Sequence, residues 1–250
     1  MATVDLESTA QALVADGKGI LAADETPTTL TRRFDALKID STPDSRRAYR
    51  ELFFTTPGVA EFISGVIMQD ETIHQKSSSG APLADVLARQ GVMPGIKVDT
   101  GAKPLAGSSA ETITEGLDGL RERLQEYRQM GARFAKWRAV IRIGEALPSS
   151  TCVHVNAHAL ARYAALCQEQ GLVPIVEPEV LMDGSHTIER CEEVTGTVLQ
   201  ATVDEALQAW QGKHENLQAG QRVFYHRAKC VSAAALGTYT KAMEGELARA

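Results

Sequence analysis

Charged side chains close four runs of the sequence that are otherwise apolar. The clearest run is Phe134–Val140, in which Lys136 and Arg138 would share one face of a β-strand, because side chains alternate in direction along a strand. A charge in such a place is costly unless it is paired or used. The other runs are Ile20–Glu25, Gly95–Asp99 and Pro174–Glu179. The charged residues of the four runs that are candidates for a site are Asp24, Lys97, Asp99, Lys136, Arg138, Glu177 and Glu179.

These residue types could support carbonyl chemistry. Lysines held beside one another in a partly dry cavity repel, which lowers their pKa and frees an amine to attack a carbonyl. Nearby carboxylates could move protons to and from the resulting adduct. Lys97, Lys136 and Arg138 could equally bind phosphate, since their spacing does not separate a nucleophile from an anion clamp. A set of internal salt bridges is the third interpretation.

The elements that must position these residues alternate between strands and helices. Short apolar runs predict strands at 19–24, 62–68, around 97, 134–140 and 172–179. Helical patterns are predicted at 6–16, 28–37, 45–54, 83–90, 110–130 and 150–171, and in a segment that ends near 207. Residues 100–110 are expected to form a long loop. The arginines of the 45–54 helix, Arg46, Arg47 and Arg50, are most simply a solvated face.

Repeated alternation of strand and helix predicts an α/β protein with a parallel sheet, either a barrel or a doubly wound sheet. A length of 250 residues is the usual size of one (β/α)₈ barrel. No G-x-G-x-x-G follows the first strand and no P-loop pattern occurs. In parallel α/β folds the chemistry lies at the carboxyl ends of the strands, where the charged residues fall. This placement favours a barrel-type site.

Composition argues against several classes of partner. A net charge of −6 gives no overall attraction to nucleic acid or to an anionic membrane. No apolar run approaches a membrane span, and the charged N-terminus lacks an apolar leader. The four cysteines form no C-x-x-C pair and no metal-ligand spacing. We therefore expect a soluble cytoplasmic protein with reduced thiols and no nucleic-acid or membrane partner.

Five motifs together resemble class I fructose-bisphosphate aldolase. They occur in the family's order and near its spacing, from residue 1 to about 207: GKGILAADE at 17–25, GIKVD at 95–99, GLDGL at 116–120, FAKWR at 134–138 and VPIVEPE at 173–179. The resemblance implies a TIM (β/α)₈ barrel that cleaves fructose 1,6-bisphosphate into dihydroxyacetone phosphate and glyceraldehyde 3-phosphate. It also implies that no metal or other cofactor takes part.

The resemblance implies catalytic roles for four residues. Asp24 would act on protons near the scissile bond, and Glu177 would be the acid/base. Glu179 would support the lysines, and Lys136 would position and polarise the substrate.

Four further residues would bind a small phosphosugar. Lys97 and Arg138 would contact its hydroxyl and phosphate groups, with Arg33 and Arg46 as more peripheral phosphate contacts. Intact members of the family are commonly homotetramers, and the sequence leaves open whether fructose 1,6-bisphosphate or fructose 1-phosphate is preferred.

One departure from the family is large. Its Schiff-base lysine lies on the sixth strand, in a motif resembling Leu-Leu-Lys-Pro-Asn, and nothing like it occurs here. The Ser-Gly-Gly and Ser-Tyr-Gly-Arg motifs of the seventh and eighth strands are also absent. The chain matches again from Ala206 onward, so roughly three βα units, on the order of 90 residues, are missing between Glu205 and Trp210. Lys229 lies in the terminal helical part and is no substitute.

We therefore expect a single domain with an incomplete barrel. Residues 1–207 would carry strands one to five with their helices, and 208–250 the last barrel helix and the C-terminal region. About five strands would leave a marginally stable open sheet with two bare edges, or a chain that self-associates.

Three functions follow from this expectation. The chain could be an aldolase by descent whose lyase activity is damaged or absent. It could be a transaldolase-like enzyme that uses Lys136 as its Schiff-base lysine. It could also be a non-catalytic phosphosugar-binding or interaction protein. We favour a surviving half-site that lacks its nucleophile.

Overall fold

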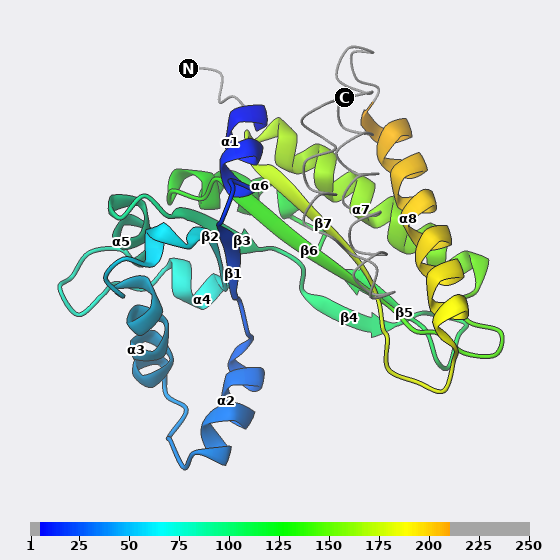
Figure 1. The fold of residues 1–250 in the computed structure, drawn as a ribbon, viewed down its shortest axis with the longest axis horizontal. Helices are drawn as coiled ribbons and strands as arrows, with labels where there is room; N and C mark the ends of the chain where they lie inside the picture. Colours follow the sequence, from blue (N-terminus) through cyan, green and yellow to red (C-terminus); the bar gives the residue numbers. More distant parts are fainter. Residues whose placement is uncertain (1–5, 211–250) are drawn as a thin grey trace.

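A five-stranded parallel sheet forms the centre of the molecule (Figure 1). The computed structural model describes residues 6–210. The strands lie in the order β1-β2-β3-β6-β7. Their bounds are Gly19–Ala23 for β1, Ile63–Met68 for β2, Met93–Lys97 for β3, Phe134–Ile141 for β6 and Val173–Val180 for β7. These confirm the five predicted strands.

Helices connect the strands. The main ones are α1 (Leu6–Leu13), α2 (Pro27–Ala36), α3 (Pro43–Phe54), α5 (Leu83–Arg89), α6 (Leu120–Gln129), α7 (Ser150–Glu169) and α8 (Ile188–Trp210). Shorter turns are η1 (Val59–Glu61) and α4 (Asp70–Ile73). Local sequence sets several of their starts: Thr42 and Ser45 form a capping box before α3, and the Ser149 side chain caps α7.

The outer face of the sheet carries the main hydrophobic core. Ile96, Ala135 and Trp137 are fully buried there against the surrounding helices. The Trp137 ring lies 5.5 Å from that of Tyr163 on α7. Trp137 therefore packs between sheet and helix, on the face opposite Lys136, as the alternation of the strand predicts.

The inner face is apolar at the amino ends of the strands. Leu13, Ile67 and Phe134 form a buried cluster there, and α1 contacts both β2 and β7. Phe134 fits because Gly95 lies beside it: a Cβ atom at Gly95 would come within 2.2 Å of the ring. Helix α1 thus covers the amino end of the inner face (Figure 1).

The sheet is not closed within the described residues. Strand β1 pairs with β2 alone and β7 with β6 alone, so one edge of each is open. This arrangement is the incomplete barrel that the sequence predicts. The predicted marginal stability and self-association stay predictions. The segment predicted as the last barrel helix and C-terminal region, 208–250, lies outside the described residues except for the end of α8.

The predictions for 100–110 and for the start of the next helix are wrong. A hairpin occupies this region, with β4 (Gly101–Pro104) antiparallel to β5 (Thr112–Glu115), and helix α6 begins only at Leu120. The hydroxyl groups of Thr112 and Thr114 donate to the carbonyls of Val140 and Arg138, which fastens β5 to the end of β6. These contacts between distant segments override the helical periodicity of the segment.

Candidate functional site

Strand register brings the predicted charged residues to one rim of the sheet. Lys97 on β3 is opposite Lys136 on β6, and Arg138 on β6 is opposite Glu177 on β7. Opposed residues of neighbouring strands point to the same face. The three cations therefore line the carboxyl end of the inner face, beyond its apolar cluster.

Lys136 is the centre of the rim. Its Nζ atom lies 2.9 Å from Oδ2 of Asp24 and 3.1 Å from Oε2 of Glu177, and the residue is only 7% exposed. Burial alone lowers the pKa of Lys136, but the two carboxylates outweigh burial and raise it. The predicted lowering of this pKa is therefore wrong, because carboxylates and not a second lysine approach the amine.

The contact between Asp24 and Lys136 also shows that the sheet is curved. Asp24 follows β1, which is separated from β6 by β2 and β3. In a flat sheet the two strands would lie about 14 Å apart, since neighbouring strands are spaced by about 4.8 Å. The 2.9 Å ion pair spans this interval, so the rim curls inward as in part of a barrel.

Lys97 and Asp99 form a second ion pair on the rim. Lys97 Nζ contacts the Asp99 carboxylate and donates to the Asp99 carbonyl oxygen at 2.8 Å. The carboxylate also accepts from the backbone amides of Gly101 at 3.1 Å and Arg138 at 3.3 Å. Asp99 thereby ties β3 to the hairpin and to β6, and it holds Lys97 in place.

Arg138 and Glu179 form the third pair and the most accessible one. The side chains are 42% and 36% exposed. The hydrogen bond from Arg138 to Glu179 is the largest cause of the raised pKa of Arg138. Because both groups remain hydrated in part, this pair costs less to separate than the buried pairs beside it.

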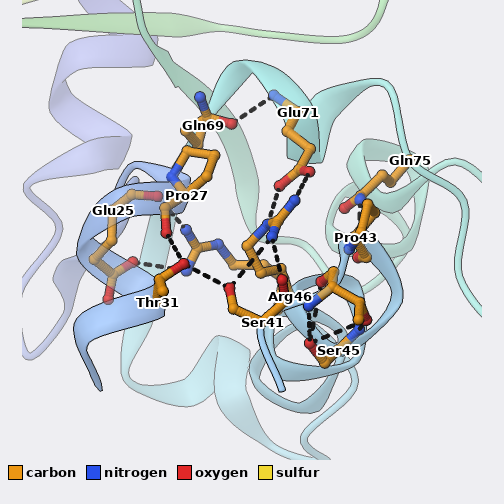
Figure 2. Close-up of polar contacts among 12 residues, drawn as sticks. Glu25, Pro27, Thr31, Ser41, Pro43, Ser45, Arg46, Gln69, Glu71 and Gln75 are labelled. Atoms are coloured by element: carbon orange, nitrogen blue, oxygen red, sulfur yellow. Dashed lines mark hydrogen bonds and ion pairs between the residues drawn. The ribbon is translucent and has the colours of Figure 1, made fainter. Parts of the chain in front are cut away.

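Arg33 and Arg46 do not join the rim in the described structure. Arg33 on α2 pairs with Glu25 and is largely exposed. Arg46 on α3 donates to both carboxylate oxygens of Glu71, at 2.8 and 2.5 Å, and to the Ser41 carbonyl at 3.2 Å (Figure 2). The hydrogen bond to Glu71 is the main cause of the raised pKa of Arg46. Their roles as peripheral phosphate contacts stay predictions.

A buried arginine was missed by the sequence reasoning. Arg50 on α3 is 1% exposed, so its prediction as part of a solvated face is wrong. It donates to the carboxylate of Glu25 at 2.7 Å and to the Glu25 carbonyl at 2.8 Å. Glu25 directly follows Asp24. The apolar neighbours of Arg50 on the helix, Phe53 and Phe54, were the available signal that this part of α3 is buried.

The rim is suited to binding a polar anion rather than to nucleophilic attack. Its three cations face four carboxylates, so an incoming phosphate must displace one of these acids. Lys136 is protonated between two carboxylates, which suits it to polarise a hydroxyl or carbonyl oxygen. Residues 6–210 contain no group of three or more His, Cys, Asp or Glu side chains placed to hold a metal ion. They also contain no helix with the length and apolar character that a membrane span requires.

Comparison with known proteins finds one family. The family model for class-I fructose-bisphosphate aldolase matches residues 5–205 and 200–250. A probable fructose-bisphosphate aldolase class 1 from Xanthomonas campestris is 61% identical over 201 residues, which are 80% of this chain and 60% of the relative. The cytosolic fructose-bisphosphate aldolase 4 of Arabidopsis thaliana is 54% identical over 199 residues, covering 80% of this chain and 51% of the relative.

A solved structure agrees with these relatives. Fructose-bisphosphate aldolase from Plasmodium falciparum, in complex with TRAP and a small-molecule inhibitor, is similar with a TM-score of 0.79 and 48% identity. The similarity covers 80% of this chain and 58% of that one. The chain thus spans between 51% and 60% of the length of these relatives.

Proposed function

This chain belongs to the class I fructose-bisphosphate aldolase family, and from that premise we propose that it binds a phosphorylated ketose at the carboxyl rim of its sheet without cleaving it. The observation that carries the proposal is the state of the rim lysines. Lys97 and Lys136, the two lysines of the rim as described, are both ion-paired. The raised pKa of Lys136 keeps its amine protonated, whereas Schiff-base chemistry requires a neutral amine.

The phosphate is expected to bind at Arg138. A guanidinium group presents two parallel N–H donors to phosphate, and the partial exposure of Arg138 lets the Glu179 carboxylate move aside into water. The sugar part would lie over Lys136, where Asp24 and Glu177 supply acceptors for hydroxyl groups. Donors and acceptors alternate across this surface, as recognition of a polyol requires.

Binding can be measured by calorimetric titration with fructose 1,6-bisphosphate. We expect Arg138→Met to weaken binding at least about tenfold, because it removes a bidentate charge-assisted contact. Arg121→Met is the matched control: Arg121 joins Glu169 between two outer helices, with both side chains largely exposed. An equal effect of the two substitutions would contradict binding at the rim.

Glu179→Gln should have the opposite effect. It removes a negative charge that competes with phosphate for Arg138. Removing one charge about 4 Å away in a water-like environment is worth about 1 kcal/mol, or about fivefold tighter binding. Weaker binding by this variant would show that Glu179 supports the site instead of competing with the ligand.

A transaldolase-like enzyme that uses Lys136 is the second candidate. The raised pKa of Lys136 opposes it, because the two neighbouring carboxylates keep the amine protonated. Treatment with dihydroxyacetone phosphate and borohydride, followed by peptide mass mapping, decides between the two functions. We expect no adduct on Lys136, and an adduct there would overturn the non-cleaving proposal.

Location and assembly are further parts of the proposal. We place the protein in the cytoplasm, in line with the cytosolic designation of its Arabidopsis relatives.

The open edges of β1 and β7 present unpaired backbone groups, which favour pairing with another chain. An interaction protein that uses these edges is therefore the remaining non-catalytic candidate. Sedimentation velocity should detect self-association, and a sharply cooperative monomer that binds no hydrophobic dye would contradict it.

A further inference from the structure

Arg50 is a buried charge outside the rim. Its guanidinium group donates from Nη1 to Oε2 of Glu25 at 2.7 Å and from Nη2 to the Glu25 carbonyl oxygen at 2.8 Å. Its Nε atom is buried and has no partner within the described structure. An arrangement of this kind costs more free energy to desolvate than an apolar side chain of similar size. Stability alone is therefore a poor reason for this arginine.

Both hydrogen bonds of Arg50 are accepted by Glu25, which connects several parts of the structure. Glu25 directly follows Asp24, whose carboxylate contacts Lys136. The Glu25 side chain also pairs with Arg33 on α2. A bond to the carboxylate fixes the side chain of Glu25, and a bond to the carbonyl fixes the peptide plane at the end of β1.

We infer that Arg50 is a positioning residue, which holds Glu25 and through it aims the adjacent Asp24 at Lys136. The use of the Asp24–Lys136 pair in ligand binding rests on the proposed function. The placement of Asp24 by Arg50 does not depend on the proposed function, and it can be measured without any ligand.

The neighbouring arginine provides a contrast. Arg47 pairs with Glu51 one turn further along the same helix, and Glu51 also accepts from Ser78, so this pair does not reach the segment between β1 and α2. Arg50 instead joins α3 to the segment between β1 and α2. Substitution of the two arginines by lysine therefore separates positioning from a general effect of altering α3.

The experiment is competitive labelling of lysines in the full chain, read by mass spectrometry as the rate for Lys136 relative to Lys97 at pH 8. In Arg50→Lys the charge remains, but a lysine does not reproduce the paired N–H donors of arginine. Asp24 should then move from Lys136, and the labelling ratio should rise about three- to tenfold, since the neutral amine fraction follows the pKa. Arg47→Lys should leave the ratio unchanged.

A second variant keeps the test decisive if Arg50→Lys does not fold. Glu25→Gln retains the carbonyl acceptor but loses the charged acceptor, so the ratio should rise by a smaller factor. An unchanged ratio in folded Arg50→Lys or folded Glu25→Gln would overturn the inference. Equal acceleration of Lys97 and Lys136 would do the same, because it indicates general loosening of the fold.

The labelling result and the proposed function fail separately. A raised Lys136 ratio in a protein that does not bind fructose 1,6-bisphosphate would sink the proposed function and leave Arg50 as a positioning residue. An unchanged ratio in a protein that binds the sugar would sink the inference alone.

Discussion

Replacing Asp24 by Asn tests the electrostatic account of Lys136 directly. Asp24 lies 2.9 Å from the lysine Nζ atom, and its side chain is 12% exposed. An opposite charge at such a distance shifts a pKa by about 1–3 units. The variant keeps the burial that lowers the pKa of Lys136 and removes the first of the two carboxylates that raise it. We expect the pKa of Lys136 to fall in this variant. A neighbouring opposite charge of this kind typically changes the protonation equilibrium about ten- to a thousandfold, and we expect the neutral amine fraction at pH 8 to rise accordingly.

Two assays measure this change. The pH dependence of Lys136 labelling gives its pKa, and borohydride trapping with dihydroxyacetone phosphate shows whether the freed amine attacks a ketone. Glu169→Gln is a suitable control, because Glu169 is a largely exposed carboxylate that pairs with Arg121 between the outer helices α6 and α7. A pKa of Lys136 that is the same in Asp24→Asn and in the parent chain would refute the electrostatic account.

The same substitution has a predictable effect on stability. The pKa of Lys136 is higher in the folded chain than the ordinary value of 10.5, so its ion pairs stabilise the fold fully below about 10.5. This contribution is lost as the pH rises through the higher folded value. Breaking a buried pair costs about 3–5 kcal/mol. We expect less for Asp24→Asn at pH 7 by urea unfolding, because Glu177 stays beside the amine, and the difference should narrow in strong alkali.

Two further predictions concern packing and pH. Gly95→Ala should cost about 1–3 kcal/mol in urea unfolding, because its methyl group overlaps the Phe134 ring; Gly19→Ala, where a Cβ meets nothing within 4 Å, should cost none, and equal losses would contradict this packing. The pKa of His74 is raised above 6.5, chiefly by its bond to the Asp70 carbonyl, so its stabilisation is present below about pH 6.5 and is lost as the pH rises through the folded value. His74→Gln should therefore lower stability by a few tenths of a kcal/mol at pH 5.5 and by nothing at pH 9, and an equal loss at both pH values would refute the assignment.

The five sheet strands were predictable because each is a short apolar run with charge at its carboxyl end. The β4–β5 hairpin was not, because nothing local distinguishes Thr112–Glu115 from the start of the amphipathic helix that follows it. Its strand conformation depends on Thr112 and Thr114, whose hydroxyl groups reach the end of β6. A sequence pattern reports local preference, and these hydrogen bonds form only after distant segments have met.

The members of the rim were predictable and their partners were not. Alternation along β6 places Lys136 and Arg138 on one face, and the carboxyl ends of parallel strands bring the other charges near. Which acid meets which base depends on register and curvature. The prediction of a lowered lysine pKa was wrong for that reason. Asp24 and Glu177 contact Lys136 from opposite edges of the sheet, and the spacing of these residues in the sequence does not indicate that they will be in contact.

The contacts of Lys136 with Asp24 and Glu177 also explain how an open sheet can keep a barrel-like site. Asp24 follows one edge strand and Glu177 lies on the other, so Lys136 joins both edges of the sheet through its single amine. At the opposite end, α1 makes a second link by contacting β2 and β7. Curvature is therefore held by an ionic link at the rim and an apolar link at the amino end. If so, Asp24→Asn should not only change a pKa but also relax the curl, and hydrogen exchange should then increase in β1 more than in the central strand β3.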